Sequence, residues 1–479
     1  MTRFFGTAAA WGLLATTALT GTAHAQDFVP PAAPPIRETI DANGVDLARG
    51  SMLGRTHSVN IGGPGALGLQ WSRTVTSDTD WRDSTAIFVS TSGATGIYTV
   101  SVGGSSESFT LSGSNYVSNQ KTGSTLTLSG STYAYTTRDG AVYKLDPWEN
   151  VVKEQYGGTH RVSTITYPTG EKLTFNWEGV DGICIITQKF PNCELRATGV
   201  RLASVEATNG YKLQFEFEEP DPALSDSTTG WAQIAKVTAL NMSVDPASQT
   251  WPTLLIDEGR GVPTAAFTDS LNRTTNYTFT SGLLSGIKRP GAASNSTTVA
   301  WSSGKVNQVV NEGVTTNYTY IDLSNVRTTT INDAISGDRV VKTDLTTMLV
   351  SSDQDEAGKI TSYLYDTNGL LTKVTAPEGN YASFEYDTRG NRTKSTLTPK
   401  AGSPLSPIFT QASYPASDAT QNWKCASGTP AVTCNKPLTT TDAKANVTNY
   451  VWDTTTGALS KVTLPAPAAG GVRPETRYT

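Results

Sequence analysis

The feature that most constrains the fold is a motif that recurs along the chain. It has two aromatic residues separated by one residue, then Asp, a turn containing Gly, and a short apolar return. The clearest copies are residues 363–375 and 384–395, offset by 21 residues (384 minus 363), with a third at 450–463 and degenerate copies near Tyr277 and Tyr318. Each copy has the size of a hairpin, and an isolated hairpin is marginal in water. Several units must therefore stack side by side to bury a common face.

Each position of the motif has a physical role. Two aromatic residues at i and i+2 lie on one face of a strand and bury a large area there. The Asp is expected to accept hydrogen bonds from backbone amides in the turn, and the Gly is expected to take the left-handed conformation. We therefore interpret the motif residues as structural; they are Tyr365, Asp366 and Gly369, Tyr386, Asp387 and Gly390, and Trp452, Asp453 and Gly457.

The rest of the chain also has the period of strands. Apolar and polar residues alternate over residues 173–177 and again over 213–217. A period of two predicts a sheet with one buried and one solvent-facing side. Only 16% of the residues are charged and 43 are Gly, which suits strands joined by turns. The sequence therefore predicts an all-β protein.

These motifs resemble the Rhs/YD-repeat family (rearrangement-hot-spot, tyrosine–aspartate repeat proteins). The resemblance is specific over residues 363–375 and 384–394, good over 450–463, and diffuse from about 146 to 340. Residues 41–50 also resemble the lead-in near the start of such proteins. The resemblance implies an N-terminal β domain followed by YD-repeat hairpins in one continuous spiralling sheet, an open or partial shell.

In several family members the shell encloses a variable C-terminal toxin, and other members are cell-wall or surface proteins. Toxin-bearing members carry a core-closing segment and a self-cleavage site after the repeats, and this sequence shows neither. Its last residues, 477–479, read like the opening strand of another repeat. We therefore expect a longer native product.

The N-terminus has the pattern of an export signal. Arg3 precedes a mostly apolar stretch, and residues 23–25 form an A-x-A cleavage site. The stretch is shorter than the roughly 20 apolar residues of a membrane span, so the mature chain is expected to be secreted, in the periplasm, at the cell surface or outside the cell, without a transmembrane segment. The predicted parts are a signal peptide (1–25), a proline-rich linker (26–38), an N-terminal β domain (39–145) and a YD-repeat array (146–479, with the clearest repeats at 353–479).

Four cysteines fall into two pairs with the same spacing, Cys184 with Cys193 and Cys425 with Cys434. In an exported protein this predicts two local disulfides. Zinc is the alternative, but zinc sites usually pair cysteines across about 2–4 residues.

Motifs for catalysis or metal binding are missing from the sequence. His57 and His160 stand outside any known nucleophile or metal motif. A carboxylate cluster near residues 216–221 (Glu216, Glu218, Glu219, Asp221) suits a solvated strand edge better than a glycosidase pair. Asp353, Asp355 and Glu356 lack the order of a calcium loop. The net charge of -5 offers no basic stripe for nucleic acid.

The sequence thus predicts a non-enzymatic shell segment of a polymorphic toxin or cell-surface protein, acting in intercellular competition or contact, without cofactors. Its expected partners are a C-terminal toxin cargo not present in this chain or a cell-surface glycan. The alternatives are a stand-alone carbohydrate-binding or adhesive surface protein and an extracellular hydrolase. Exposed aromatic residues would serve sugar binding, but alternation places Trp177, Trp301 and Trp452 in the core.

Overall fold

The computed structural model is all-β, as predicted from the sequence. It describes residues 39–63, 65–77, 81–92, 96–147, 158–185, 195–218, 231–258, 263–333, 335–468 and 470–478. Short helical turns are inserted between strands at η1 (Gly65–Leu67), η2 (Pro246–Ser248) and α2 (Ala431–Cys434). None of the helices in these ranges has the length and apolar character that a membrane crossing requires.

Three groups of antiparallel strands follow one another along the chain. The first is a small separate sheet of β1 (Thr56–Gly62), β2 (Gly68–Val75) and β3 (Trp81–Asp83). The second group is β4 (Ile87–Ser92), β5 (Ile97–Val102), β6 (Ser105–Ser112), β7 (Asn115–Ser118), β8 (Thr125–Ser129), β9 (Thr132–Thr136), β10 (Val142–Pro147) and β11 (Gly158–Thr166).

The third group is the long sheet, in which each strand pairs with the next one in sequence. Its strands are β12 (Lys172–Ile185), β13 (Leu195–Ala207), β14 (Tyr211–Phe217), β15 (Ile234–Asn241), β16 (Thr253–Asp257), β17 (Thr264–Asp269), β18 (Thr274–Thr280), β19 (Leu283–Lys288), β20 (Thr297–Ser302), β21 (Lys305–Asn311), β22 (Val314–Leu323), β23 (Val326–Asp333), β24 (Arg339–Asp344), β25 (Val350–Gln354), β26 (Ile360–Tyr365), β27 (Leu371–Thr375), β28 (Tyr381–Tyr386), β29 (Arg392–Thr398), β30 (Ile408–Ser413), β31 (Thr439–Thr441), β32 (Val447–Trp452), β33 (Leu459–Thr463) and β34 (Glu475–Arg477).

Strand β11 is shared by the second and third groups, because it pairs with strands of both. One of its edges pairs with β10. Its other edge is shared, because the backbone from Gly158 to Arg161 pairs with β4 while Thr164–Thr166 pair with β12. The pairing with β4 closes β4–β11 into a small barrel, and the pairing with β12 starts the long sheet.

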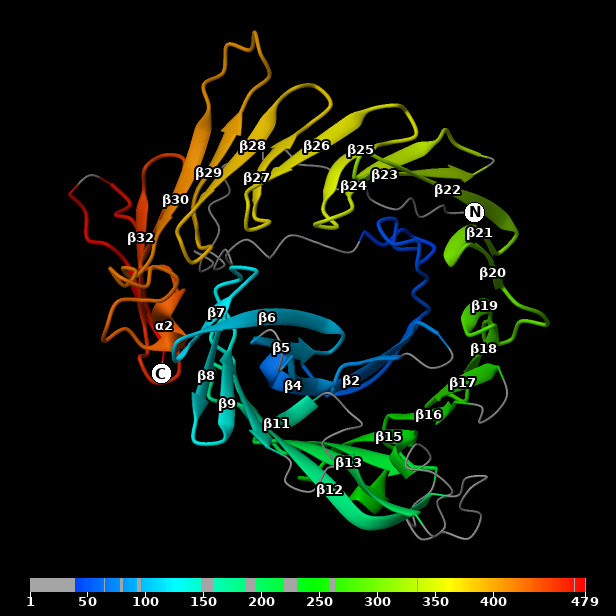
Figure 1. Cartoon of the computed structure of the whole chain (residues 1–479). Coiled ribbons are helices and arrows are strands. Elements are labelled where there is room, and N and C mark those ends of the chain that lie inside the picture. Colours follow the sequence, from blue (N-terminus) through cyan, green and yellow to red (C-terminus); the bar gives the residue numbers. More distant parts are fainter. Residues whose placement is uncertain are drawn as a thin grey trace.

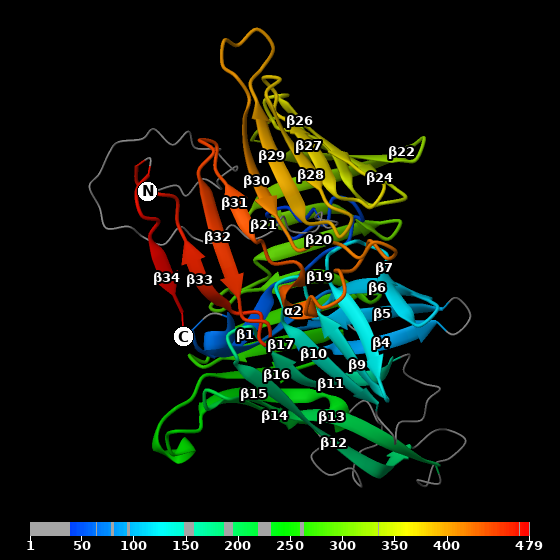
Figure 2. The same cartoon turned by 90° about the vertical axis from the view of Figure 1, so that its left-hand side faces the viewer.

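The long sheet winds around the N-terminal strands. In Figure 1 it passes from β12 through β22 to β32 around an open centre, with β2 lying inside the curve. Figure 2 shows the same winding from the side, with β33 and β34 at one end of the sheet. One side of the sheet therefore faces inward, and we call it the inner face.

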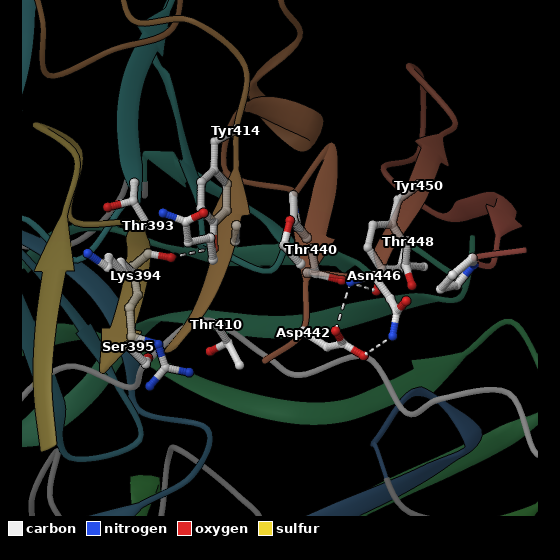
Figure 3. A pocket seen from close by; sticks show the side chains of 16 residues that line it. Thr393, Lys394, Ser395, Thr410, Tyr414, Thr440, Asp442, Asn446, Thr448 and Tyr450 are labelled. Carbon is white, nitrogen blue, oxygen red and sulfur yellow. Dashed lines mark hydrogen bonds between the residues drawn. The ribbon is translucent and has the colours of Figure 1, made fainter. Parts of the chain in front are cut away.

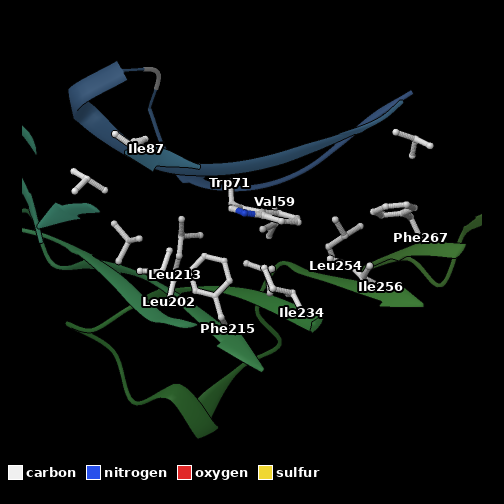
Figure 4. Packing of buried hydrophobic residues seen from close by; sticks show 14 of the residues in the cluster. Val59, Trp71, Ile87, Leu202, Leu213, Phe215, Ile234, Leu254, Ile256 and Phe267 are labelled. Carbon is white, nitrogen blue, oxygen red and sulfur yellow. The ribbon is translucent and has the colours of Figure 1, made fainter. Parts of the chain in front are cut away.

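The core lies between the N-terminal sheet and the inner face of β13–β17 (Figure 4). Trp71 of β2 has no exposed surface, and its ring meets Phe215 of β14 edge to face at 6.2 Å between centroids. Leu213 and Phe215 are buried while Gln214 and Glu216 point away, which confirms the alternation expected for this strand. Replacing a buried Trp by Ala typically costs about 3–5 kcal/mol.

Residues 41–50 cover the next part of the inner face. The Thr329 hydroxyl donates to the carbonyl of Leu47 at 2.7 Å, and the Arg327 guanidinium donates to the carbonyl of Ala48 at 2.8 Å. The N–H of Val306 donates to the carbonyl of Gly50 at 2.8 Å. The N-terminal segment is therefore held by inner-face donors from β21 and β23, through its own backbone carbonyls.

Candidate functional site: repeat turns, ring junction and inner face

The turn after β26 shows how the motif aspartate works. One carboxylate oxygen of Asp366 accepts hydrogen bonds from the N–H groups of Asn368 (2.8 Å) and Leu370 (2.9 Å). Gly369 lies between them with φ of 78°, a conformation that costs glycine little. The aspartate thus replaces water as the acceptor for two turn amides.

The same turn recurs at Asp387, which follows Tyr386, and at four aspartates that no tyrosine precedes. In each case the carboxylate accepts from the amides at i+2 and i+4, and the residue at i+3 has positive φ. For Asn272 and Ala445 that φ is 56° and 63°. The sequence motif missed most of these turns because it was defined by the tyrosine; a search for Asp followed at i+3 by Gly or Asn finds all but one of them. The aspartates are Asp41, Asp269, Asp355, Asp387 and Asp442.

Asp453 and Asp344 form a longer version of the turn. Asp453 accepts from the amides of Thr455 and Thr456, and the left-handed residue is Gly457. The backbone and side-chain donors of Thr456 hold the pKa of Asp453 below its usual value. Backbone and hydroxyl donation by Thr347 likewise lowers the pKa of Asp344, against a smaller effect of burial. These carboxylates are therefore ionised turn acceptors.

At Tyr386 and Trp452, the second aromatic of the motif ties its strand to the segment before it. Tyr386 donates through its hydroxyl to the carbonyl of Leu371 at 2.7 Å, and Trp452 donates through its indole N–H to the carbonyl of Pro437 at 2.8 Å. Trp177 and Trp301 donate to the carbonyls of Val162 (2.7 Å) and Leu284 (2.8 Å) in the same way.

All four aromatic residues follow a register shift in their strand, and so does Tyr365. A bulge re-aims the side chain that follows it, which lets the ring reach back to the preceding carbonyl. The motif position therefore extends to β12 and β20. Sequence reasoning placed Trp177 and Trp301 in the core and missed this shared position, although Trp at the end of an alternating strand was the available signal.

One motif turn (387–391) and the segment 431–436 meet the barrel at one place, and a second motif turn packs on that segment at Gly457. We call this place the ring junction (residues 121–123, 137–141, 387–391, 431–436 and 457). The side chain of Asn435 donates to the carbonyl of Gly123 at 2.5 Å and accepts from the side chain of Asn391 at 3.0 Å. Lys436 donates to the carbonyl of Asp139. In Figure 1, α2 lies beside β7 and β8 at this point.

Close backbone approach gives two motif glycines a second role at the junction. A Cβ on Gly390 would lie 2.3 Å from the carbonyl oxygen of Lys121, and one on Gly457 would lie 2.7 Å from that of Val432. Both glycines also have positive φ. These two positions therefore require glycine for two reasons: the backbone has positive φ, and there is no room for a Cβ atom.

The predicted disulfide Cys425–Cys434 is present and shapes the junction loop between β30 and β31, with a Cα–Cα distance of 5.7 Å. It ends at the residue before Asn435, so it holds the segment that contacts the barrel. Arg389, only 3% exposed, reinforces the loop by donating to the hydroxyl of Ser417 (2.8 Å) and the carbonyl of Pro415 (2.6 Å). The predicted pair Cys184 and Cys193 lies outside the residues whose side chains are described.

Beyond β25 the inner face carries few charged side chains. Arg392, which pairs with Tyr386 at the register shift, lies 5.6 Å from the Phe384 ring at the edge of this face. The other charged residues of β26–β34 lie by register and ion pairing on the outer face; they are Lys373, Glu385, Lys394, Lys461, Glu475 and Arg477. The inner face of these strands instead carries hydroxyl and aromatic side chains, Tyr363, Tyr365, Phe384 and Tyr450 among them.

The histidines occupy structural positions. The ring of His57 stacks on Phe267 at 4.2 Å between centroids and lies 2.7 Å from the Tyr277 hydroxyl, and burial lowers its pKa to about 4. His160 contacts the carbonyl of Ser131 at 3.0 Å, and burial also lowers its pKa. Within the described ranges, no group of three or more His, Cys, Asp or Glu side chains is placed to hold a metal ion.

The carboxylates singled out in the sequence are spread over separate roles. Glu216 pairs with Lys236 at 2.8 Å and Asp353 pairs with Arg339 at 2.7 Å, while Asp355 accepts turn amides. Glu219 and Asp221 lie outside the described residues. Sequence reasoning missed Glu107, which is buried in the barrel and accepts from the Tyr135 hydroxyl at 3.0 Å and the Ser118 hydroxyl at 2.6 Å.

Comparisons with solved structures return chains of the TcdB2-TccC3 assembly. A crystal structure of TcdB2-TccC3 without hypervariable C-terminal region has a TM-score of 0.37 and 10% identity over 85% of this chain. The structures of TcdB2-TccC3 and of TcdB2-TccC3-Cdc42 have TM-scores of 0.31 and 0.32, each at 12% identity, over 88% and 87% of this chain. This chain spans only 22–23% of the length of those chains. A search of curated proteins gave no match.

A comparison with protein-family models is more specific. The model described as RHS Repeat matches residues 365–401. That range begins at Tyr365 and contains the Asp366 turn, the Asp387 turn and strands β27–β29. Residues 365–401 are an RHS repeat, which confirms over that stretch the resemblance predicted from the tyrosine and aspartate motifs.

Proposed function

We propose that this chain is a wall segment of a hollow shell that encloses a polypeptide, exported from the cell and acting in intercellular competition or contact. The observation that carries the proposal is the inner face of β26–β34, which is uncharged apart from the edge residue Arg392. The same face of β13–β24 already holds polypeptide, residues 41–75, by hydrogen bonds and apolar packing. The RHS repeat at 365–401 supports a role of this kind.

Enclosure is tested by protection from a protease. A short unstructured reporter with one cleavage site is fused after Thr479 of the full chain, and its cleavage is compared with that of the free reporter. Cleavage of an enclosed segment requires opening of the wall, so we expect it to be at least about tenfold slower in the fusion. A fusion cleaved as fast as the free reporter would refute enclosure.

Export is tested separately from enclosure. N-terminal sequencing of the protein recovered from outside the cytoplasm of the source cells should begin at Gln26, the residue after the predicted cleavage site. A product retained in the cytoplasm with Met1 or Thr2 at its N-terminus would contradict export and leave the enclosure test unaffected.

A further inference from the structure

A pocket of about 240 Å³ opens on the inner face between β29 and β32 (Figure 3). It lies where small side chains replace the aromatic rows of neighbouring strands. Ser395, Thr410 and Ala412 share the inner face by register, and Thr440 and Thr448 continue the row across β31 and β32. Tyr414 and Tyr450 also line the pocket.

The hydroxyl groups of the pocket are available to a ligand. Those of Ser395, Thr410 and Thr448 have no side-chain hydrogen-bond partner in the part of the chain that the structure describes. Tyr450 pairs with Thr440 at 3.0 Å, and Tyr414 donates to the carbonyl of Arg392 at 3.3 Å. The phenol groups and the Thr440 hydroxyl are thus engaged, while the hydroxyls of Ser395, Thr410 and Thr448 remain free donors, the last of them on a residue that is only 4% exposed.

The charges around the pocket do not favour an ionic ligand. The Asp442 carboxylate is used by its own turn, accepting from the amides of Lys444 and Asn446. Lys394 belongs to the outer face, where its ammonium pairs with Glu385 at 3.4 Å. Arg392 remains as the one cation among the pocket-lining residues whose side chain lies toward the inner face. An uncharged ligand therefore fits the lining best.

The covered half of the same face shows what such hydroxyls bind. Thr329, with no exposed surface, donates to the carbonyl of Leu47. Thr316 and Tyr318 accept from the side-chain amide of Asn43 at 3.1 and 2.9 Å. The Tyr318 hydroxyl also donates to the Asp41 carboxylate at 2.5 Å. These inner-face hydroxyls thus contact a polypeptide mainly through its carbonyl and amide groups, with one carboxylate among the acceptors.

We propose that the pocket between β29 and β32 binds an uncharged polypeptide segment. Ser395, Thr410 and Thr448 donate to its backbone carbonyls, and one apolar side chain of the segment packs beside Tyr414 and Tyr450. This inference rests on the proposed enclosure of a polypeptide, which supplies the segment. It goes further by assigning one binding site and by requiring that the bound segment carry no charged side chains.

The test uses the full chain and a fluorescent nonapeptide of Ala, Thr, Pro and one Leu, blocked at both ends. Two charged versions carry Glu or Lys at two of the Ala positions. Fluorescence anisotropy should show saturable binding of the neutral peptide, with affinity at least about tenfold weaker for both charged versions. Equal binding of all three peptides would overturn the proposal.

Strand β30 provides a matched pair of variants. Thr410→Arg places a cation in the pocket and should weaken peptide binding at least about tenfold. Phe409→Arg, at a position on the opposite face of the same strand that does not line the pocket, should change it less than about twofold. If Thr410→Arg shows no cooperative thermal unfolding transition, it has not folded. Ala412→Leu, which fills the pocket with an apolar side chain, then replaces it and should weaken peptide binding to the same extent.

Two further outcomes would overturn the proposal. One is binding of an oligosaccharide such as chitotriose, sensitive to Thr410→Arg, without binding of the peptide, which would assign the pocket to glycans. The other is binding of neither probe. The protease assay on the fused reporter does not require this pocket, so enclosure can hold while the pocket proposal fails.

Discussion

At the scale of single residues, the motif aspartates differ in what depends on them. In the Asp366 turn, Thr367 and Asn368 are exposed, whereas Gly369 and Leu370 are buried. Asp387 likewise accepts from the backbone amides at i+2 and i+4. It also binds the side chains of Asn391 (2.9 Å) and Arg389 (3.0 Å). The Asn391 amide also donates to Asn435. Because Asn391 has no exposed surface, loss of the Asp387 carboxylate still leaves one N–H of this buried amide unsatisfied.

We expect Asp366→Ala to lower the free energy of unfolding by about 1 kcal/mol, as for a lost capping residue, and Asp387→Ala to lower it by about 3 kcal/mol, because a buried polar group also loses its partner. Urea unfolding of the two variants measures the difference. Equal effects would mean that the junction does not depend on the Asp387 carboxylate.

The motif tyrosines offer a second matched pair. Tyr386→Phe removes a hydrogen bond to the carbonyl of Leu371 and should cost about 1 kcal/mol. Tyr365→Phe should be nearly neutral, because the Tyr365 hydroxyl has no hydrogen-bond partner among the described residues. Thermal unfolding of the two variants, measured in parallel, checks this difference. An equal loss of stability in both would contradict the proposal that the bulge directs the ring toward the preceding carbonyl.

Local chemistry made much of this predictable. An Asp followed by Gly at i+3 specifies its own turn, since the donors and the acceptor are a few residues apart. The position shared by Trp177, Trp301 and Tyr386 was not predicted, because it depends on a register shift between two strands. A shift of register leaves no mark in the alternation of a single strand.

At the scale of elements, the Cys425–Cys434 loop carries the contacts between the long sheet and the barrel. Its spacing predicted the disulfide. Its partner surface was not predictable, because Gly123 and Asp139 lie about 300 residues earlier in the sequence and no local pattern links them to Asn435 and Lys436.

Replacing both cysteines with Ser should cost about 2–3 kcal/mol from the loop constraint and loosen the junction on both sides. Hydrogen exchange should quicken in residues 414–438 and in 121–141, because Asn435 and Lys436 hold those loops together. Residues 211–217, in the core of the sheet, serve as the internal control. Faster exchange confined to 414–438 would show that the barrel loops are held by other contacts.

At the scale of the whole molecule, His57 links the N-terminal sheet to the long sheet by its contacts with Phe267 and Tyr277. Burial holds its pKa near 4, below the ordinary value of 6.5. The native state therefore favours the neutral ring. The stability this gives is complete above about pH 6.5 and is lost as the pH falls through about 4.

We expect the wild-type protein to lose about 2 kcal/mol more than His57→Phe between pH 7 and pH 4, with the value discounted because the ring is only partly buried. Phe keeps the stacking on Phe267 and removes the titration. His160→Gln, in the barrel, tests whether the effect belongs to His57. Parallel pH profiles for the wild type and His57→Phe would contradict the assignment.

The all-β class and the continuous repeat sheet followed from the period of two and the stacking requirement. The closure of β4–β11 and the sharing of β11 between two groups of strands did not, since alternation tells which face a residue occupies and not which strand lies beside it. The placement of residues 41–50 on the inner face was also hidden, because its donors, Thr329 and Arg327, come from a distant strand.

The ring junction also sets an order of events during synthesis. Neighbouring strands pair over short sequence separations and can form as the chain emerges, whereas the junction joins residues 121–140 to residues 387–457. Contacts of such long range form slowly and late. Until residue 436 has left the ribosome, the contacts of Asn435 and Lys436 with the barrel cannot form. The barrel loops therefore wait, during synthesis, for a partner made about 300 residues later.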